Sequence, residues 1–500
     1  MSVSDSITHA ALVSQVNGIV SAAGSRPAAT GGAFKNGVVT TYGPDGSQKA
    51  AVGQLSFDQT QFASDGSITG GQILHSSATP DGQPLTSTTI QLAPGGKPTQ
   101  AEMQIHNRQG DGIYSILNAD LSALQWTDAG KISSGNIGLA TKDPVTGLPT
   151  TSGSMVFQNE KFTSGSLTHY SPKDGKTVDS LTELDYSETQ LVGLKVTGGQ
   201  MKVTRKNPDQ TISSTSQVFF VDNGLGRVNQ IQTANMVSGS NQLKSNVTAD
   251  YSGLTYNARN EIDSGDLNID VKAPDQTPVS HAVISFAGAV PTTAQCWRFQ
   301  GGVLANKTVT DYSNAKFDNH NRIVNGSIKV DVYDGAEQHL SSTSMSYDQN
   351  GTVTNKQTQT FPVAATKPTP MAYPEVAAQW NNPSAQSSSA AQPQATVAKA
   401  ASVSTAPAAG AANAAPQTKN VYRSDGTLEE RVITTSQNGK PVSSVVTHYD
   451  IDGKTIVNTF NIDLTKVVMP TGPGKPSGSV SLQEFTGGTT LHSESTFNYS

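Results

Sequence analysis

Apolar and polar residues alternate along most of the chain with the two-residue period of a β-strand. The alternation is clear in IKVDV at 328–332 and in LNIDV at 267–271. Because every second side chain of a strand lies on one face, these segments predict strands with one apolar and one charged face. Asp-Gly and Pro-Asp pairs separate such segments. These pairs predict hairpin turns between neighbouring antiparallel strands.

A glycine followed two residues later by an apolar residue marks each copy of an internal repeat, of which 310–347 is the clearest. Six copies lie between about residue 35 and the C-terminus, and the first five glycines are roughly 65 residues apart. The repeat glycines are Gly71, Gly135, Gly199, Gly265, Gly326 and Gly478.

Large apolar side chains recur at fixed distances before these glycines, and we predict structural roles for them. Tyr186, Tyr251 and Tyr312 lie thirteen or fourteen residues before, each within an Asp-(Leu/Tyr)-Ser triplet, and Trp126 and Phe317 are nine residues before. We interpret the aspartates as solvated strand-edge charges that discourage aggregation. They are Asp120, Asp185, Asp250 and Asp311.

The repeat predicts an all-β fold of about four strands per unit. Periods of this length are typical of arrays, solenoids and propellers. Hydroxyl-rich strands and an interruption before the sixth copy favour an open, elongated, twisted antiparallel sheet over a six-bladed β-propeller. A roll or sandwich is a third alternative.

Four regions are predicted along the chain. Residues 1–34 contain one helix at 4–23, an end cap or a docking signal, and no other helix is expected. Residues 35–363 form the repeat array, and the Ala-, Pro-, Ser- and Gln-rich segment 364–418 is a linker. Residues 419–500 resume the repeat and could act apart from the array. Bare strand edges near residue 35 and at Tyr499 would then allow head-to-tail self-association. The alternative is a monomer in which the N-terminal helix caps one edge and the C-terminal segment folds back over the other.

Composition narrows the class of function. The formal net charge is −6 and charged residues make up 14% of the chain. Nucleic-acid binding is not expected, because it requires clustered Lys and Arg. One cysteine, Cys296, excludes an intramolecular disulfide and favours a small buried side chain. No segment is apolar enough for a membrane-spanning helix, and no secretory signal is found, so the location is cytoplasmic or reached by a non-Sec route.

The hairpin signatures YDQNG at 347–351, YDIDG at 449–453 and YGPDG at 42–46 resemble those of YD/Rhs-type and MORN-type β-hairpin repeats. The resemblance implies shells or elongated sheets in which Tyr and Gly set the strand and the turn. The resemblance carries over no catalytic residue.

We predict no catalytic, metal-binding or cofactor-binding residue. Asp450-Ile451-Asp452-Gly453 begins like a calcium loop but lacks the later ligands, so we interpret it as a tight turn. His169 and His448 share a position in the repeat without indicating an active site. The leading function is a non-enzymatic structural or adhesive scaffold for a protein, a polysaccharide or a second copy. The alternative is a glycan-binding or hydrolytic propeller with a polar central pocket.

Overall fold

The computed structural model shows an all-β protein built on one large antiparallel sheet. It describes residues 33–499 apart from 44, 65–67, 108–109, 127–131, 193–194, 222–225, 241, 260, 319–321, 350, 363–368, 381–414, 424 and 469–475. The predicted helix at 4–23 lies outside the described residues. A propeller is excluded, because its blades would be separate sheets.

The first two repeat units each contribute four long strands, of which the first is broken and continues as a short strand. The first unit contains β2 (Lys49–Ser56), β3 (Thr60–Phe62), β4 (Ile68–Ala78), β5 (Pro84–Leu92) and β6 (Pro98–His106). The second contains β7 (Ile113–Asp120), β8 (Leu124–Trp126), β9 (Ile132–Lys142), β10 (Pro149–Gln158) and β11 (Lys161–Tyr170).

The third and fourth units keep this order, and in the fifth the first strand runs on without a separate short strand, with a shift in pairing between Asp311 and Asn314. The third contains β12 (Val178–Asp185), β13 (Thr189–Val192), β14 (Lys195–Lys206), β15 (Ile212–Phe220) and β16 (Val228–Met236). The fourth contains β17 (Leu243–Asp250), β18 (Leu254–Tyr256), β19 (Ile262–Lys272), β20 (Pro278–Ala287) and β21 (Val290–Gln300). The fifth contains β22 (Val303–Phe317), β23 (Ile323–Asp334), β24 (His339–Tyr347) and β25 (Val353–Thr360).

The C-terminal segment belongs to the same sheet. Its strands are β26 (Gln417–Tyr422), β27 (Leu428–Gln437), β28 (Lys440–Tyr449), β29 (Ile456–Asp463), β30 (Val467–Val468), β31 (Ser477–Thr486) and β32 (Thr490–Tyr499). The last of these pairs with β1 (Phe34–Tyr42), placing Phe34 opposite Tyr499. The predictions of bare edges near residue 35 and at Tyr499, and of an independent C-terminal segment, are therefore wrong.

The linker prediction for 364–418 also needs correction. Residues 373–380 form a helix, α2 (Tyr373–Trp380), so a described helix exists outside 4–23. Met371 N donates to Gly335 O (3.0 Å) and Leu304 N donates to Met371 O (2.8 Å), which ties this stretch to the ends of two hairpins. Val376 is fully buried against Trp297 and its neighbours, so a small apolar cluster anchors the helix.

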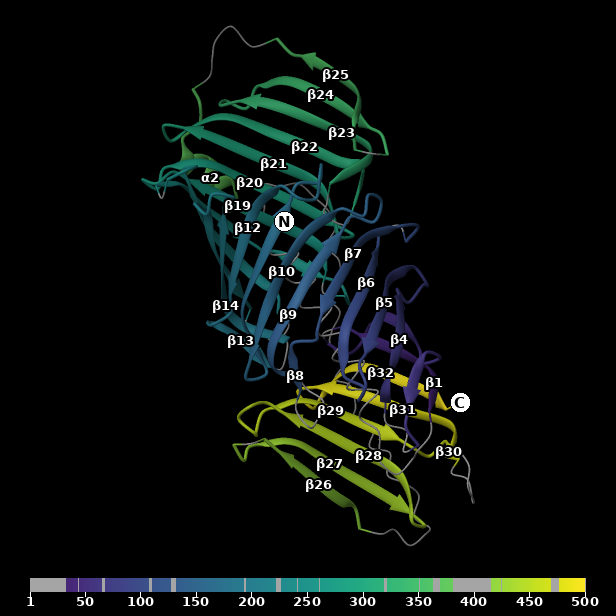
Figure 1. Cartoon of the computed structure of the whole chain (residues 1–500). Coiled ribbons are helices and arrows are strands. Elements are labelled where there is room, and N and C mark those ends of the chain that lie inside the picture. The colour runs from purple at the N-terminus through teal and green to yellow at the C-terminus, as the bar shows by residue number, and fades with distance from the viewer. Residues whose placement is uncertain are drawn as a thin grey trace.

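The sheet coils back toward itself, and its main core forms where it does so. The strands of β26–β29 and β21–β25 lie at opposite ends of the sheet (Figure 1). Side chains from β1–β15 and from β28–β32 form one cluster, with Ile73, Leu117 and Phe157 fully buried. The turn after β1 lies against the turn after β18, because a Cβ on Gly43 would come within 3.1 Å of Ala258 Cα. The sequence pattern therefore builds one curled sheet whose inner face is the core.

Candidate functional surface

The six repeat glycines occupy equivalent corners, where a long strand faces the break in its neighbour. Their φ values lie between 76° and 120°, in the region that favours glycine. A Cβ on Gly71 would lie 2.2 Å from Gln59 O, and one on Gly326 would lie 2.0 Å from Asn314 O. Both the backbone conformation and the close approach therefore require glycine. The other four, Gly135, Gly199, Gly265 and Gly478, meet a carbonyl oxygen in the same way, at 2.1–2.4 Å.

The aspartates of the Asp-(Leu/Tyr)-Ser triplets form the break in each strand. Ser122 N donates to Asp120 Oδ1 (3.0 Å), and Ser252 N donates to Asp250 Oδ1 (2.9 Å). The Ser122 hydroxyl and N–H donate to Asp120 and hold the pKa of that carboxyl below its usual value. Our interpretation of these residues as edge charges is wrong, because their strands are internal and the carboxylates cap turns. Asp185 and Asp311 accept the same bond from Ser187 and Ser313.

The large residues predicted as structural positions lie around these corners. Tyr186 is buried, and burial raises the pKa of its phenol to about 12. Phe317 is buried 5.9 Å from the half-buried Tyr312 ring, and Trp126 packs against the main core. Tyr251 is half-buried at the equivalent corner. The predicted residues thus repeat one structural arrangement and do not converge on one site.

The face opposite the core carries polar side chains over seven neighbouring strands, β31, β32, β1, β2, β4, β5 and β6. Antiparallel pairing aligns these side chains, with the apolar Leu74 and Val38 among them, in two cross-strand rows, which we call the polar face. One row is Ser479, Asn498, Asn36, Ser56, Leu74, Thr89 and Glu102. The other is Ser481, Thr496, Val38, Gln54, Ser76, Ser87 and Gln104.

A hollow of about 490 Å³ lies on the polar face, between β1 and β6. Gln54, Ser76, Ser87, Glu102 and Gln104 are among the residues that line it. Hydroxyl and amide groups in such a hollow can donate and accept hydrogen bonds, and a carboxylate can accept them. The hollow therefore offers groups for several polar contacts at once.

Hydrogen bonds join the polar face across the pairings of β31 with β32 and of β32 with β1. The Tyr42 hydroxyl donates to Glu494 Oε2 (2.6 Å), and Gln483 Nε2 donates to Glu494 Oε1 (2.8 Å). The bond to Glu494 raises the pKa of the Tyr42 phenol to about 12, and both donors hold the pKa of Glu494 below its usual value. Asn498 Nδ2 also donates to Asn36 Oδ1 (2.7 Å). These bonds fix the strands that carry the two rows.

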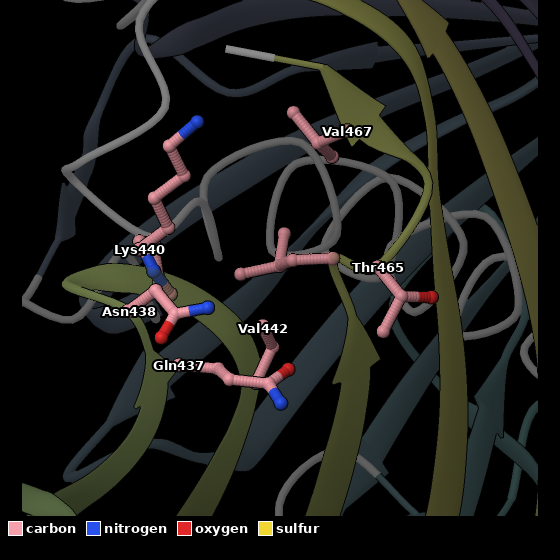
Figure 2. Close-up of a pocket in the computed structure, with 8 residues that line it drawn as sticks. Gln437, Asn438, Lys440, Val442, Thr465 and Val467 are labelled. Carbon is pink, nitrogen blue, oxygen red and sulfur yellow. The ribbon is translucent and has the colours of Figure 1, made fainter. Parts of the chain in front are cut away.

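A smaller hollow of about 280 Å³ lies near the turn between β27 and β28 (Figure 2). Val442, Leu464 and Val467 supply its apolar lining, and Asn438 and Lys440 supply polar groups. Leu464 is itself the buried corner residue of the sixth repeat unit. We interpret this hollow as the space left at a corner.

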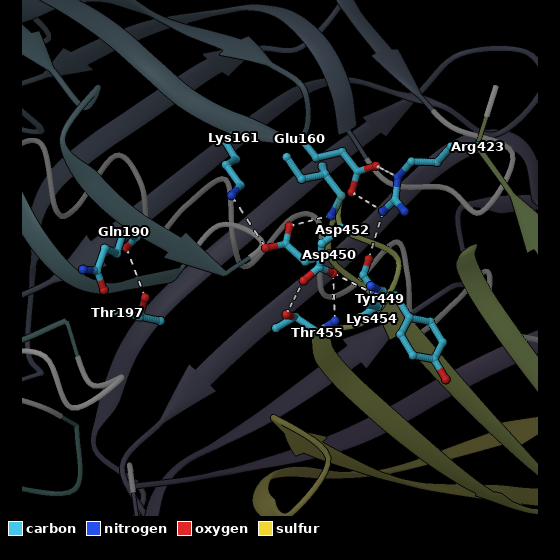
Figure 3. Close-up of polar contacts among 11 residues, drawn as sticks. Glu160, Lys161, Gln190, Thr197, Arg423, Tyr449, Asp450, Asp452, Lys454 and Thr455 are labelled. Atoms are coloured by element: carbon cyan, nitrogen blue, oxygen red, sulfur yellow. Dashed lines mark hydrogen bonds and ion pairs between the residues drawn. The ribbon is translucent and has the colours of Figure 1, made fainter. Parts of the chain in front are cut away.

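A largely buried ion pair ties the C-terminal segment to the turn between β10 and β11 (Figure 3). Arg423 Nε donates to Glu160 Oε1 (2.6 Å), and Arg423 also donates to Tyr449 O (2.9 Å). The two side chains are 11% and 13% exposed. Lys161 and Asp450 form a second ion pair beside it at 3.6 Å. These four residues, which we call the clasp, hold two distant parts of the sheet together.

Other candidate groups act within hydrogen-bonded strands or turns. His448 Nε2 lies 3.0 Å from Glu430 Oε2, and His169 Nε2 lies 3.2 Å from Thr182 Oγ1. Gly453 N donates to Asp450 O (2.9 Å), which confirms the predicted turn. Among the described residues, no three His, Cys, Asp or Glu side chains gather closely enough to hold a metal ion. No described helix is long and apolar enough to cross a membrane.

The clasp and the α2 anchor were not predicted from the sequence. Arg423 and Glu160 are 263 positions apart and each lies in an ordinary hairpin turn. A signal was present at the polar face, because hydroxyl and amide residues alternate with core residues along β4, β5 and β6. The residues opposite each other can be named only once the strand register is known.

Comparisons with known proteins give no family for this chain. No protein-family model matches it, and no curated protein sequence matches it. One similar solved structure is named "Crystal Structure of TcdB2-TccC3-TEV", with 10% sequence identity and a TM-score of 0.10. The match covers 88% of this chain but 28% of that chain. The present chain therefore spans less than a third of the length of that structure.

Proposed function

We propose that this protein is a non-enzymatic structural or adhesive scaffold whose polar face contacts a protein or polysaccharide surface. The observation that carries the proposal is the pair of cross-strand rows on the polar face, which extends from β31 through β32 and β1 to β6. A hollow of about 490 Å³ lies on this face between β1 and β6. The rows present hydroxyl, amide and carboxylate groups at the regular spacing of an antiparallel sheet. A polymer with repeated hydroxyl or amide groups can meet many of them at once.

Binding of this kind draws its strength from many weak contacts. A hydrogen bond exchanged with water contributes about 0.5–1.5 kcal/mol net, so one contact gives little affinity. Contacts on one rigid sheet act together, because the first one holds the others near their partners. We therefore expect a single alanine substitution of Glu102, Asp250, His169 or His448 to leave binding broadly unchanged.

Co-sedimentation with insoluble polymers tests the proposal. The probes are cellulose and chitin, with plates coated with collagen and with fibronectin as protein surfaces. We expect the full chain to bind at least one of them at micromolar concentration. The double variant Gln54→Ala/Gln104→Ala removes two amides from the hollow and is expected to weaken that binding about tenfold, as two lost hydrogen bonds imply.

A matched control is available on the same face of the sheet. Gln217 on β15 and Gln232 on β16 are paired, exposed glutamines outside the hollow. Gln217→Ala/Gln232→Ala is expected to bind as the unaltered chain does, and both variants should keep the same circular dichroism spectrum. Equal loss in both variants, or no binding to any of the four surfaces, would rule out recognition through the hollow.

A further inference from the structure

The two edges of the sheet are β25 and β26, the strands on either side of residues 361–416. Within the described chain, β25 pairs only with β24, and β26 pairs only with β27. All eight residues of β25 are exposed. An edge strand presents unpaired N–H and C=O groups that serve as a template for a further strand. The edges thus lie far from the positions that the sequence suggested.

The number of strands fixes the direction of both edges. Five of the 32 described strands are short and continue a neighbouring strand; they are β3, β8, β13, β18 and β30. Counting each of these together with the strand that it continues leaves 27 successive rungs, meaning strand positions across the sheet, from β26 to β25. Every described pairing between successive rungs is antiparallel. Because 27 is odd, β25 and β26 run in the same direction relative to the sheet. A head-to-tail contact between β25 and β26 of two copies would therefore be parallel.

An antiparallel contact that keeps the core faces of both copies on the same side requires two like edges related by a twofold axis. We propose that β25 pairs with β25 of a second copy of this chain, so that the sheet continues across the axis. This contact is isologous and closes at two copies. It deepens the proposed scaffold function, on which it rests, by naming its self-association partner, and it differs from the head-to-tail arrangement that the sequence allowed as an alternative to a monomer.

The backbone groups available for this contact can be assigned. Phe361 N donates to Leu340 O (2.9 Å), so Phe361 directs its backbone groups toward β24. Counting back along the pairing of β25 with β24, every second residue from Phe361 does the same. In an antiparallel ladder, alternate residues direct their N–H and C=O groups to opposite sides. The residues that direct these groups outward are Thr354, Lys356, Thr358 and Thr360.

Charge selects the register of the two strands. A twofold axis at Lys356 would place two ammonium groups directly opposite each other, which destabilises a strand pair. An axis at Gln357 places Lys356 opposite Thr358 of the partner subunit and overlaps the strands from Thr354 to Thr360. The two lysines remain diagonal neighbours, so added salt should strengthen association by screening them.

Disulfide trapping tests this register in a Cys296→Ala background, since Cys296 is the single native cysteine. In the proposed register Gln357 faces its own copy at a non-hydrogen-bonded position, where Cα atoms lie about 4.5 Å apart. This distance suits a disulfide. Gln357→Cys is expected to form a covalent dimer under mild oxidation. Asn355→Cys is the control, since it would face residue 359 of the other copy and should stay monomeric.

Sedimentation velocity with Thr358→Pro supplies a second test. Proline removes an outward N–H and leaves the ladder to β24 in place, so the fold should persist by circular dichroism. We expect the unaltered chain to dimerise at high micromolar concentration and Thr358→Pro to weaken dimerisation at least tenfold. Lys356→Thr should strengthen it several-fold.

A monomer at every concentration, an equal dimer in Thr358→Pro, or trapping through Asn420→Cys on β26 alone would each overturn the proposal. Polymer binding by Thr358→Pro separates the two proposals. If it matches the unaltered chain, the polar face functions whatever the outcome at β25. If polymer binding is absent while the Gln357→Cys dimer forms, the proposed surface fails and the edge contact stands.

Discussion

Two sections of the same sheet use the same repeat but bury it to different degrees. The wound section comprises β1–β15 and β28–β32, and the open section comprises β17–β25. Four residues after the corner glycine, Leu139 and Val203 of the wound section are 4% and 3% exposed. The equivalent Ile269 and Val330 of the open section are only half-buried. The repeat sequence sets the corners everywhere, but burial depends on whether another part of the sheet lies opposite.

This difference shows that the corners are set by local contacts, whereas the burial of the core is set by contacts between distant parts of the chain. The glycine corners and the turn-capping aspartates recur in both sections and depend on neighbouring strands alone. The main core requires strands distant in sequence to come together, which the clasp and the pairing of β32 with β1 accomplish. We expect stability to be highest in the wound section, since opening free energies follow buried apolar contact.

The largest expected effect comes from truncating matched core positions. Leu139→Ala in the wound section should destabilise by about 2–5 kcal/mol, because it leaves a cavity in a packed core. Ile269→Ala should cost less than half as much, since its half-buried site is already open to solvent. Native-state hydrogen exchange measured strand by strand compares the two. Equal losses would show that the open section has a core as dense as the wound one.

Breaking the clasp should affect the wound section almost as strongly. Glu160→Gln leaves the Arg423 guanidinium buried with a neutral partner, and removing one member of a buried ion pair costs roughly 3–5 kcal/mol. Both side chains keep some exposure, so we expect the lower end of that range. Faster hydrogen exchange should appear in β10, β11 and β26–β28, with no change in β22–β25. Lys307→Gln, which ends an exposed pair with Glu337 at 3.3 Å in the open section, is the control.

Corner glycines should respond alike in the two sections. Gly135→Ala and Gly326→Ala each place a Cβ against a carbonyl oxygen at 2.3 and 2.0 Å, on a backbone with positive φ. Each should destabilise by about 1–3 kcal/mol, as other strained backbone positions do. Thermal unfolding of both variants measures this, with Gly147→Ala as a partial control that shares the positive φ but meets no neighbouring atom. A loss confined to Gly135→Ala would mean that the core, and not the corner, demands glycine.

The smallest effect is a titration at the joint between β32 and β1. The pKa of Tyr42 is about 12 in the fold and about 10 when unfolded, so its stabilisation is complete below pH 10 and disappears as the pH rises through 12. Glu494 has a lowered pKa, so its contribution is present above about pH 4.5 and disappears as the pH falls through the folded value. Ultraviolet titration of Tyr42 in Glu494→Gln should show its pKa moving back toward 10.

The sequence predicts the corners well because their causes are local. A positive φ and a close carbonyl oxygen require glycine whatever lies beyond the neighbouring strand. The six repeat glycines, from Gly71 to Gly478, can therefore be recognised from their spacing in the sequence. The sixth unit also keeps the aspartate, at Asp463, whose Oδ1 accepts a hydrogen bond from Thr465 N at 2.9 Å. The equivalence of Asp463 to the other aspartates is hard to recognise in the sequence, because the residues between Asp463 and Gly478 depart from the repeat pattern. The all-β class and the open antiparallel sheet were predicted correctly for the same local reason.

The coiling and the edges were beyond the sequence because they depend on pairing across the whole chain. VVTTYGPDG at 38–46 resembles SLTHYSPKDGK at 166–176, the fourth strand of its unit. β1, which contains residues 38–42 of the first segment, therefore follows β32 in the sheet and is the fourth strand of the sixth unit. The likeness was visible, but a periodic sequence does not say that a unit begins at one terminus and finishes at the other. Nor does the low-complexity segment reveal that Val376 fits against Trp297.

The pairing of β32 with β1 also imposes a delay during biosynthesis, because the two strands are made at different times. Phe34 and Tyr499 face each other although they are 465 positions apart in the sequence. At about 5–20 residues per second, a ribosome needs roughly 25–90 s to make the intervening chain. β2 pairs with one edge of β1 early, but the other edge has no partner strand until β32 is made and can capture the wrong strand. A chaperone that shields this edge until β32 has been made would therefore raise the yield of this protein.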